Sequence, residues 1–362
     1  MPATLDFFSS YVLAAIVKEV VPNTSFFRDR YFPTGEGDII GADKVLCEYQ
    51  DGDRTMAPFV TERVGDIPVE RQGFQIYEYE PACIKISRPL KADELKKRMF
   101  GEALYANSDA ATRAARLIAD DFTTLDKRIQ RREEWMAVQT MINNACTMQE
   151  YIDAQTKGEI KHIQFYQGST DHTYTVANKW NSTNGDFMGD VSEMCRMLSK
   201  RGLPRTDLVL GVDAARAILK NEEVRQLLDK NSGIFVGSIK PTLTKYDGVT
   251  ALGTLNFDGN ELILWEVDEE VVDETGATVK LFPSTSAMVT APNCGHIAYG
   301  AMWQIDYGAT EHTMHIGNRI PKLSVNQETD IRKLRLGCKP LAMPRNKSPY
   351  ILSLIHISEP TR

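Results

Sequence analysis

The stretch that decides the fold runs from Ser108 to Glu150 and reads SDAATRAARLIADDFTTLDKRIQRREEWMAVQTMINNACTMQE. It contains no proline and no glycine, and its apolar residues from Leu117 to Ala145 recur with the spacing of one helical face. At 1.5 Å per residue, about 40 residues form a rod of roughly 60 Å, whereas a mean helix has roughly 11 or 12 residues. We therefore predict one very long helix over Ser108–Glu150, N-capped by Ser108, which is unusual for a compact enzyme.

The middle of this helix, from Asp126 to Glu134, is densely charged. A solvated helical face is the simplest interpretation of such a run. A contact with a neighbouring subunit is the alternative, because mixed charges fix the register and the choice of partner. The candidate assembly residues on the helix are Lys127, Arg128, Arg131, Arg132 and Glu134.

The chain before the helix predicts an arm followed by a ribbon. An amphipathic helix is expected over Phe7–Val20, and an aromatic stretch begins at Phe26. Within residues 57–89, the alternating runs Pro68–Gly73 and Phe74–Tyr79 predict a two-stranded ribbon. Its tip is too polar for burial within its own chain and supplies the remaining candidate assembly residues, Arg63, Asp66, Glu70 and Arg71.

The chain after the helix predicts a mixed region, so the fold class is α+β. A helix over Val191–Arg201 should stop at Gly202. Asp207–Val212 predicts a buried strand, followed by an amphipathic helix over Asp213–Lys230. Further strands are expected at Thr250–Leu255, Glu261–Val267, Val279–Phe282 and Ser286–Thr290, with a hairpin tip at Asp268–Asp273.

Composition excludes several classes of protein. A chain of 362 residues with 42% hydrophobic and 25% charged residues is globular and long enough for two or three subdomains. The net charge of −7 argues against a protein whose main role is to grip nucleic acid, and no apolar run is long enough to span a membrane. The six scattered cysteines fit reduced thiols that pack as small apolar residues.

The sequence offers no convincing chemical site. It lacks a P-loop, a G-x-G-x-x-G and a G-x-S-x-G motif. His312 and His315 lie in a strand-like segment that places them on opposite faces, so they should not share a metal ion. Cys294 and His296 lie close together, but no orienting carboxylate is evident nearby. We therefore expect no catalytic residue, no metal and no cofactor.

The predicted elements follow one another as an arm, a ribbon, a very long helix and a mixed α/β region. This order resembles that of a subunit of a protein shell. The chain resembles the phage major capsid protein E family, the lambda-type branch of the Hong Kong ninety-seven capsid fold. The matching pieces appear in the family's order and cover almost all of residues 20–351. They are Phe26–Pro33, Met56–Val60, Arg131–Gln139, Lys179–Asn181, Asp207–Gly211, and Lys339–Leu341 through Pro344.

The resemblance implies the parts of such a subunit. It implies an N-terminal arm at 1–56, an extended E-loop at 57–89, a spine helix with the first part of a peripheral P-domain at 90–205, an axial A-domain at 206–307, and the rest of the P-domain at 308–351. It also implies a non-enzymatic protein that assembles in the host cytoplasm, through pentamers and hexamers, into an icosahedral virion shell around double-stranded DNA. The implied partners are further copies, packaged DNA contacted non-specifically, a separate scaffolding protein, a portal and, as a further candidate, a decoration protein.

Two other interpretations stay open at this point. An encapsulin-type compartment shell would share the fold without the viral role. A soluble enzyme with a site assembled from distant residues is the second alternative.

The last stretch, Leu352–Arg362, breaks with the preceding pattern. It resembles the translation of a sequencing adapter, so we expect it to be foreign to the fold.

Overall fold

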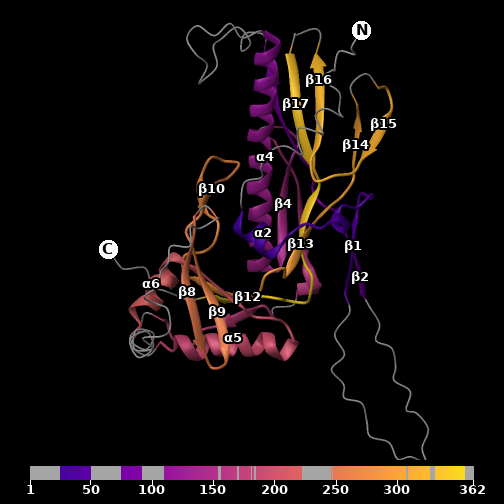
Figure 1. The fold of residues 1–362 in the computed structure, drawn as a ribbon. Helices are drawn as coiled ribbons and strands as arrows, with labels where there is room; N and C mark the ends of the chain where they lie inside the picture. Colours follow the sequence, from indigo (N-terminus) through magenta and orange to yellow (C-terminus); the bar gives the residue numbers. More distant parts are fainter. Residues whose placement is uncertain are drawn as a thin grey trace, which may run out of the picture.

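The protein forms two packed bodies, one built around a long helix and one around a six-stranded sheet (Figure 1). The structure is a computed structural model. It describes residues 25–49, 75–91, 110–153, 156–168, 171–180, 182, 185–221, 246, 248–306, 309–326 and 331–354. The predicted helix Phe7–Val20 and the ribbon tip therefore lie outside the described residues.

The long helix of the first body is α4 (Ala110–Asn143), which confirms the very long helix that the sequence predicts. It ends at Asn143 and not near Glu150. The next residue, Asn144, has a φ of 51°, a left-handed conformation that stops the helix, and its side-chain amide donates to the carbonyl of Phe165. The following residues instead form strand β4 (Ala145–Tyr151), which pairs with β5 (Lys157–Gln164), and the 3-10 turn η2 (Phe165–Gly168) comes next.

One face of α4 is buried against strands from both ends of the chain. A three-stranded antiparallel sheet, in the order β16-β17-β3, lies along the helix (Figure 1). Its strands are β16 (Ile320–Asn326), β17 (Ile331–Cys338) and β3 (Ile84–Leu90). Strand β18 (Pro340–Pro344) also contacts α4 and pairs with β13 (Gly295–Tyr299). The predicted apolar face is buried at Ile118, Phe122, Leu125, Ile129, Met136, Ala137 and Met141.

The second body is a sheet with two helices packed on it. The strand order is β6-β19-β12-β7-β9-β8, and the helices are α5 (Phe187–Arg201) and α6 (Val212–Lys220). The strands are β6 (Thr173–Thr175), β7 (Asp207–Gly211), β8 (Val249–Phe257), β9 (Asn260–Val267), β12 (Ser286–Thr290) and β19 (Ile351–Leu354). Helix α5 ends where predicted, since Gly202 adopts a φ of 72°, whereas α6 ends at Lys220 before a part of the chain that is not described.

The sheet of the second body is buried on both faces. In β7, Leu208 and Leu210 pack with α5 and α6, whereas Val209 between them belongs to the core around α4. Strand β12 shows the same alternation, because Met288 belongs to the α4 core and its two neighbours do not. A strand that is buried on both faces has a continuous apolar run in its sequence, which explains the sequence of Asp207–Gly211.

The domain boundaries implied by the resemblance stay predictions, and the structure shows in which core each segment packs. Helix α5, which falls in the expected P-domain segment 90–205, packs in the second core with β7. After β12 the chain returns to the first body, where β13 pairs with β18 and β14 (Met302–Ile305) pairs with β15 (His312–His315). Strand β13 therefore packs in the core around the long helix.

The described part of the predicted ribbon pairs with an earlier segment of the chain, and Pro68–Gly73 lies outside the described residues. Strand β2 (Gln75–Tyr79) pairs with β1 (Val45–Tyr49), so its partner lies earlier in the chain than Pro68–Gly73. The β1–β2 ribbon leaves the first body at the opposite side from α4 (Figure 1). Strand β3, also expected in the ribbon, pairs with β17 instead.

Two smaller segments differ in part from the expectations. The acidic segment is not a tip alone, since β10 (Glu270–Val272) pairs with β11 (Thr278–Lys280) and the turn between them is built on the Asp273 carboxylate. The residues expected to be foreign to the fold contribute to β19 as far as Leu354. The origin of Leu352–Arg362 stays a prediction, and residues 355–362 lie outside the described part of the chain.

Candidate assembly site

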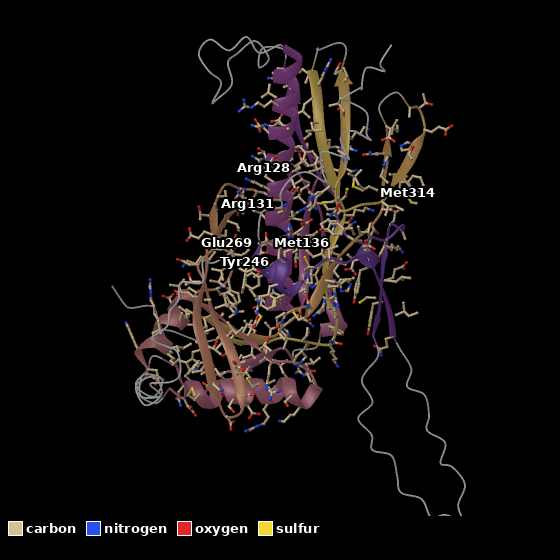
Figure 2. The ribbon with its side chains drawn as sticks, in the orientation of Figure 1. Arg128, Arg131, Met136, Tyr246, Glu269 and Met314 are labelled. Atoms are coloured by element: carbon tan, nitrogen blue, oxygen red, sulfur yellow. The ribbon has the colours of Figure 1, made fainter. Side chains whose placement is uncertain are left out.

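The short helix α2 (Phe26–Tyr31) holds the two bodies together. It precedes the 3-10 turn η1 (Glu36–Asp38) and contacts α4. Phe26 packs edge-on against Tyr246 at 5.2 Å and lies 5.1 Å from the Trp265 ring, so it reaches the second body. Figure 2 shows Tyr246 and Glu269 beside α4 at the level of Met136.

Two carboxylates fix α2 from opposite sides. Glu134 of α4 accepts hydrogen bonds from the backbone N–H groups of Phe27 and Arg28, each at 2.7 Å. Asp207 of β7 accepts from Arg30 Nε at 2.5 Å, from Arg30 Nη2 at 2.9 Å and from the Tyr31 hydroxyl at 2.9 Å. Both carboxylates are buried, and each accepts hydrogen bonds from donors that would otherwise lack a partner.

The pKa values follow from this burial. Burial raises the pKa of Glu134 to about 8, although the two backbone donors act in the opposite direction. Burial and the neighbouring Asp207 raise the pKa of Tyr31 well above its ordinary value. These groups are held in place by packing and are not exposed to a substrate.

A second buried network ties α4 to the chain before β16. Arg319 donates from Nη1 and Nη2 to the two oxygens of Glu133, at 2.6 and 2.9 Å, and also pairs with Asp126. The Tyr299 hydroxyl donates to Glu133 at 2.9 Å. Arg319 is nearly buried, and although this burial acts to lower its pKa, the charge of Glu133 and the hydrogen bonds to it raise the pKa well above the ordinary value.

The structure therefore divides the charged run of the helix. Glu134 is buried and bonded within its own chain, whereas its assignment to a subunit interface stays a prediction. Arg132 is half-buried, pairs with Glu274 of the β10–β11 turn and lies over the Trp135 ring at 5.0 Å. Lys127, Arg128 and Arg131 are exposed, and of the residues predicted on the helix these three remain available to a partner.

The helical period could have separated these residues in advance. Glu134 precedes Ala137, Val138 and Met141 by three, four and seven positions, and all three are fully buried. The roles of Arg30, Asp207 and Arg319 had no such signal, because their partners are distant in sequence. The ribbon candidates Arg63, Asp66, Glu70 and Arg71 lie outside the described residues.

The remaining exposed surface of interest is apolar. On the β1–β2 ribbon, Leu46 is 58% exposed and Ile76 is 55% exposed. On the β14–β15 hairpin, Trp303 is 52% exposed and stands opposite Met314. Exposed apolar residues grouped on ribbons are typical of surfaces that another protein covers.

The chemical alternatives gain no support from the structure. Burial raises the pKa of the Cys294 thiol to about 12, the reverse of an activated nucleophile, and the thiol faces the Tyr31 carbonyl. His312 and His315 lie on opposite faces of β15, as predicted, and His315 pairs with Asp306 at 2.9 Å. All six cysteines are free.

Two other kinds of site are absent from the described residues. They contain no cluster of three residues suited to a metal ion. No helix among them has the length and apolar character needed to cross a membrane.

Comparison with solved structures defines the class of protein by its fold. The chain is similar to a protein described as a prophage capsid protein from E. coli CFT073, with a TM-score of 0.64, 18% identity, and coverage of 96% of this chain and 99% of that one. It is also similar to a phage-related protein from Bordetella bronchiseptica, with a TM-score of 0.50, 10% identity, and coverage of 96% and 97%. A chain from Mycobacterium phage Bobi matches at a TM-score of 0.44 with 12% identity and 92% coverage of both chains. The fold is that of a phage capsid subunit.

The family follows from the sequence model. The chain belongs to the phage major capsid protein E family, whose model matches residues 9–351. It is thus a structural protein of the phage head, and the encapsulin alternative has less support. No curated protein matches the sequence.

Proposed function

We propose that copies of this chain assemble through pentamers and hexamers into a closed icosahedral shell around double-stranded DNA. The observation that carries the proposal is the β1–β2 ribbon, which projects from the first body with Leu46 and Ile76 turned outward. Among the described residues each of its strands is paired on one edge only. Apolar residues and open strand edges are costly on a free subunit, and overlap with a neighbour covers both. Closed symmetry then limits the assembly to rings and shells.

The exposed basic residues of α4 are the proposed binding surface for residues 50–74 of a neighbouring subunit. Lys127 and Arg131 lie one helical turn apart, and Arg128 lies beside them. Residues 50–74, which lie between β1 and β2 in the sequence, include five acidic and three basic residues. Opposite charges of this kind steer the encounter and fix the register more than they add affinity.

The other partners of the proposed assembly come from the family alone. They are a separate scaffolding protein, a portal, and a decoration protein as a further candidate, with assembly in the cytoplasm of the bacterial host. Contact with packaged DNA is proposed to be non-specific, and the net charge of −7 fits a wall that repels the DNA and leaves it mobile. We propose no enzymatic activity.

Electron microscopy of the purified chain tests the proposal. Negative stain should show closed particles, and a monodisperse monomer under all conditions would overturn the assembly itself. Deletion of Val64–Gln72 should leave a folded subunit, checked by circular dichroism and thermal unfolding, that forms no closed shell. Closed particles from that deletion would overturn the role of the ribbon loop.

A further inference from the structure

The three-stranded sheet β16-β17-β3 carries a group of basic side chains on the face turned away from α4. The two leucines of β17 are buried in the core around α4, so the alternation of a strand turns Lys333 and Arg335 to the other face. Arg335 stands directly opposite Lys322 of β16. Lys85 of β3 pairs with Gly337 and therefore lies diagonally to Arg335. These four residues, Lys85, Lys322, Lys333 and Arg335, are called the basic cluster below.

The charges of the basic cluster repel one another. Like charges on directly opposite residues destabilise a sheet, because their Cβ atoms are about 5 Å apart. Lys322 and Arg335 form such a pair, and burial together with the charges of Arg335 and Lys85 lowers the pKa of Lys322. Asp306 acts in the opposite direction, but it also pairs with His315 at 2.9 Å. A destabilising arrangement of this kind is typical of a functional site.

The protein positions Arg335 without neutralising it. Arg335 Nη2 donates to the Gln304 side-chain oxygen at 2.8 Å, and Gln304 is 3% exposed, so a buried amide holds the guanidinium in place. The Arg335 Nε–H group is buried and has no acceptor among the described residues, which is costly. Within the described part of the chain, no salt bridge joins a carboxylate to any member of the basic cluster. The cluster therefore lacks an anion.

Hydroxyl groups add donors on the same face of the sheet. Ser87 stands opposite Arg335, Ser324 stands opposite Lys333, and both serines are exposed. Lysine and serine are depleted in interfaces between proteins. Arginine, lysine and serine are instead the side chains that contact phosphate oxygens. The composition of this face thus favours a phosphate over an acidic segment of another protein.

We propose that the basic cluster is a binding site for phosphate groups. Arg335 would supply a planar fork that matches two phosphate oxygens, and the lysines would act as point charges around it. Free phosphate carries about two negative charges at pH 7, and a nucleic-acid backbone carries one on every nucleotide, so either matches several cations better than a single carboxylate does. The site lies within one subunit, so the inference goes beyond the proposed shell assembly and does not depend on it.

Thermal unfolding of the purified chain tests whether the cluster lacks an anion. In chloride at low salt, Lys322→Gln should unfold at a higher temperature than the wild type, because the substitution removes the repulsion with Arg335. Lys161→Gln is the matched control, since Lys161 also lies on a strand but pairs with Glu80 and Glu150. Its midpoint should stay equal or fall. An equal or lower midpoint for Lys322→Gln would overturn the uncompensated cluster.

Inorganic phosphate is the first probe of binding. At constant ionic strength and tenfold above the dissociation constant, phosphate should raise the midpoint of the wild type and of Lys161→Gln by about 2 °C relative to chloride. Lys322→Gln and Arg335→Gln should keep the wild-type circular dichroism spectrum and lose this shift. Titration calorimetry should show binding to both variants weakened by about tenfold or more. A shift that survives in both variants would overturn the site.

A short DNA duplex and poly-glutamate identify the source of the anion. Stabilisation by the duplex at a lower concentration of phosphate groups, lost in Arg335→Gln, would support the site with a nucleic-acid backbone as its ligand. Equal or weaker stabilisation by the duplex would support it with free phosphate. Stabilisation by poly-glutamate and by neither phosphate probe would overturn phosphate as the ligand. Particle formation is scored separately by electron microscopy, so failure of the proposed function and failure of this site are distinguishable.

Discussion

Arg30 of α2 and Asp207 of β7 form a two-point ion pair across the boundary between the two bodies, with the carboxylate fully buried. The guanidinium also lies over the Trp265 ring at 4.9 Å. Bidentate pairs of this kind fix orientation as well as distance. The six residues of α2 therefore set how the sheet of the second body sits on the long helix.

Removal of Asp207 should destabilise the folded subunit. Asp207→Ala leaves Arg30 and the Tyr31 hydroxyl without their partner, and breaking a buried pair costs about 3 kcal/mol. Urea unfolding followed by circular dichroism measures the loss. Asp213→Ala is the control, because Asp213 forms an exposed pair with Arg216 at 3.8 Å and should change stability by less than about 1 kcal/mol. Equal effects of the two substitutions would contradict the role of Asp207.

The pKa of Glu134 should appear in the pH dependence of stability. Its folded-state value of about 8 lies above the ordinary 4.5, so the folded protein binds this proton more tightly than the unfolded chain. The contribution is complete below about pH 4.5 and is lost as the pH rises through 8, with a slope of up to about 1.4 kcal/mol per pH unit. Arg28 and Glu269 are the charged side chains that act on it.

Glu134→Gln tests this dependence because it removes the proton but keeps the size of the side chain. The free energy of unfolding of the wild type, measured in urea between pH 5 and pH 9, should fall more steeply than that of the variant. The variant carries a constant offset, since its amide can accept from only one of the two backbone donors. Glu193→Gln, at an exposed position of α5, should keep the wild-type slope. Parallel curves for Glu134→Gln and the wild type would show that Glu134 does not titrate in this range.

Local sequence patterns predicted individual helices and strands. The pairing of strands that are distant in sequence could not be predicted from such patterns. The length of α4, the stop of α5 at Gly202 and the strand β7 follow from helical period, glycine and an apolar run. The pairing of β2 with β1 has no local signal, because residues 50–74 separate the two strands in the sequence. The return of β13 to the first body also depends on its pairing with β18.

The charged residues of the candidate site show the same limit. The helical period could have excluded Glu134 from the surface, since its neighbours one turn away are buried. No local pattern indicates that Arg319 pairs with Glu133, because the two residues are 186 positions apart. Exposure of Trp303 depends on the pairing of β14 with β15, which sequence alternation alone does not specify.

Charge reversal on α4 should slow assembly. The double substitution Arg128→Glu and Arg131→Glu replaces two exposed positive charges by negative ones on the proposed binding surface of α4. Light scattering should show at least a tenfold lower assembly rate at low salt and a smaller difference at high salt, because steering between exposed charges is screened. Lys200→Glu with Arg216→Glu, on the helices of the second body, is the matched control. Wild-type rates for the α4 variant at both salt concentrations would exclude this surface.

Truncation within β19 should lower the free energy of unfolding. Leu352 and Ser353 are buried, and β19 lies between β6 and β12, so it is not an edge strand. The Leu352 N–H donates to the His172 carbonyl at 2.7 Å. A chain ending at Leu354 keeps all of β19 and is the reference for the comparison. A chain ending at Ile351 should lose about 2–3 kcal/mol, from the burial of Leu352 and the loss of backbone pairing.

The identity of these last residues should matter less than their presence. Strand pairing uses the backbone, so Leu352→Ile should cost less than about 1.5 kcal/mol in urea unfolding, as volume-conserving substitutions do. Leu352→Asp should cost more than truncation at Ile351, because it forces a charge into the core around α4. Equal stability of the Ile351 and Leu354 truncations would show that the strand contributes nothing beyond Ile351. A large loss for Leu352→Ile would instead show that the core requires leucine at this position.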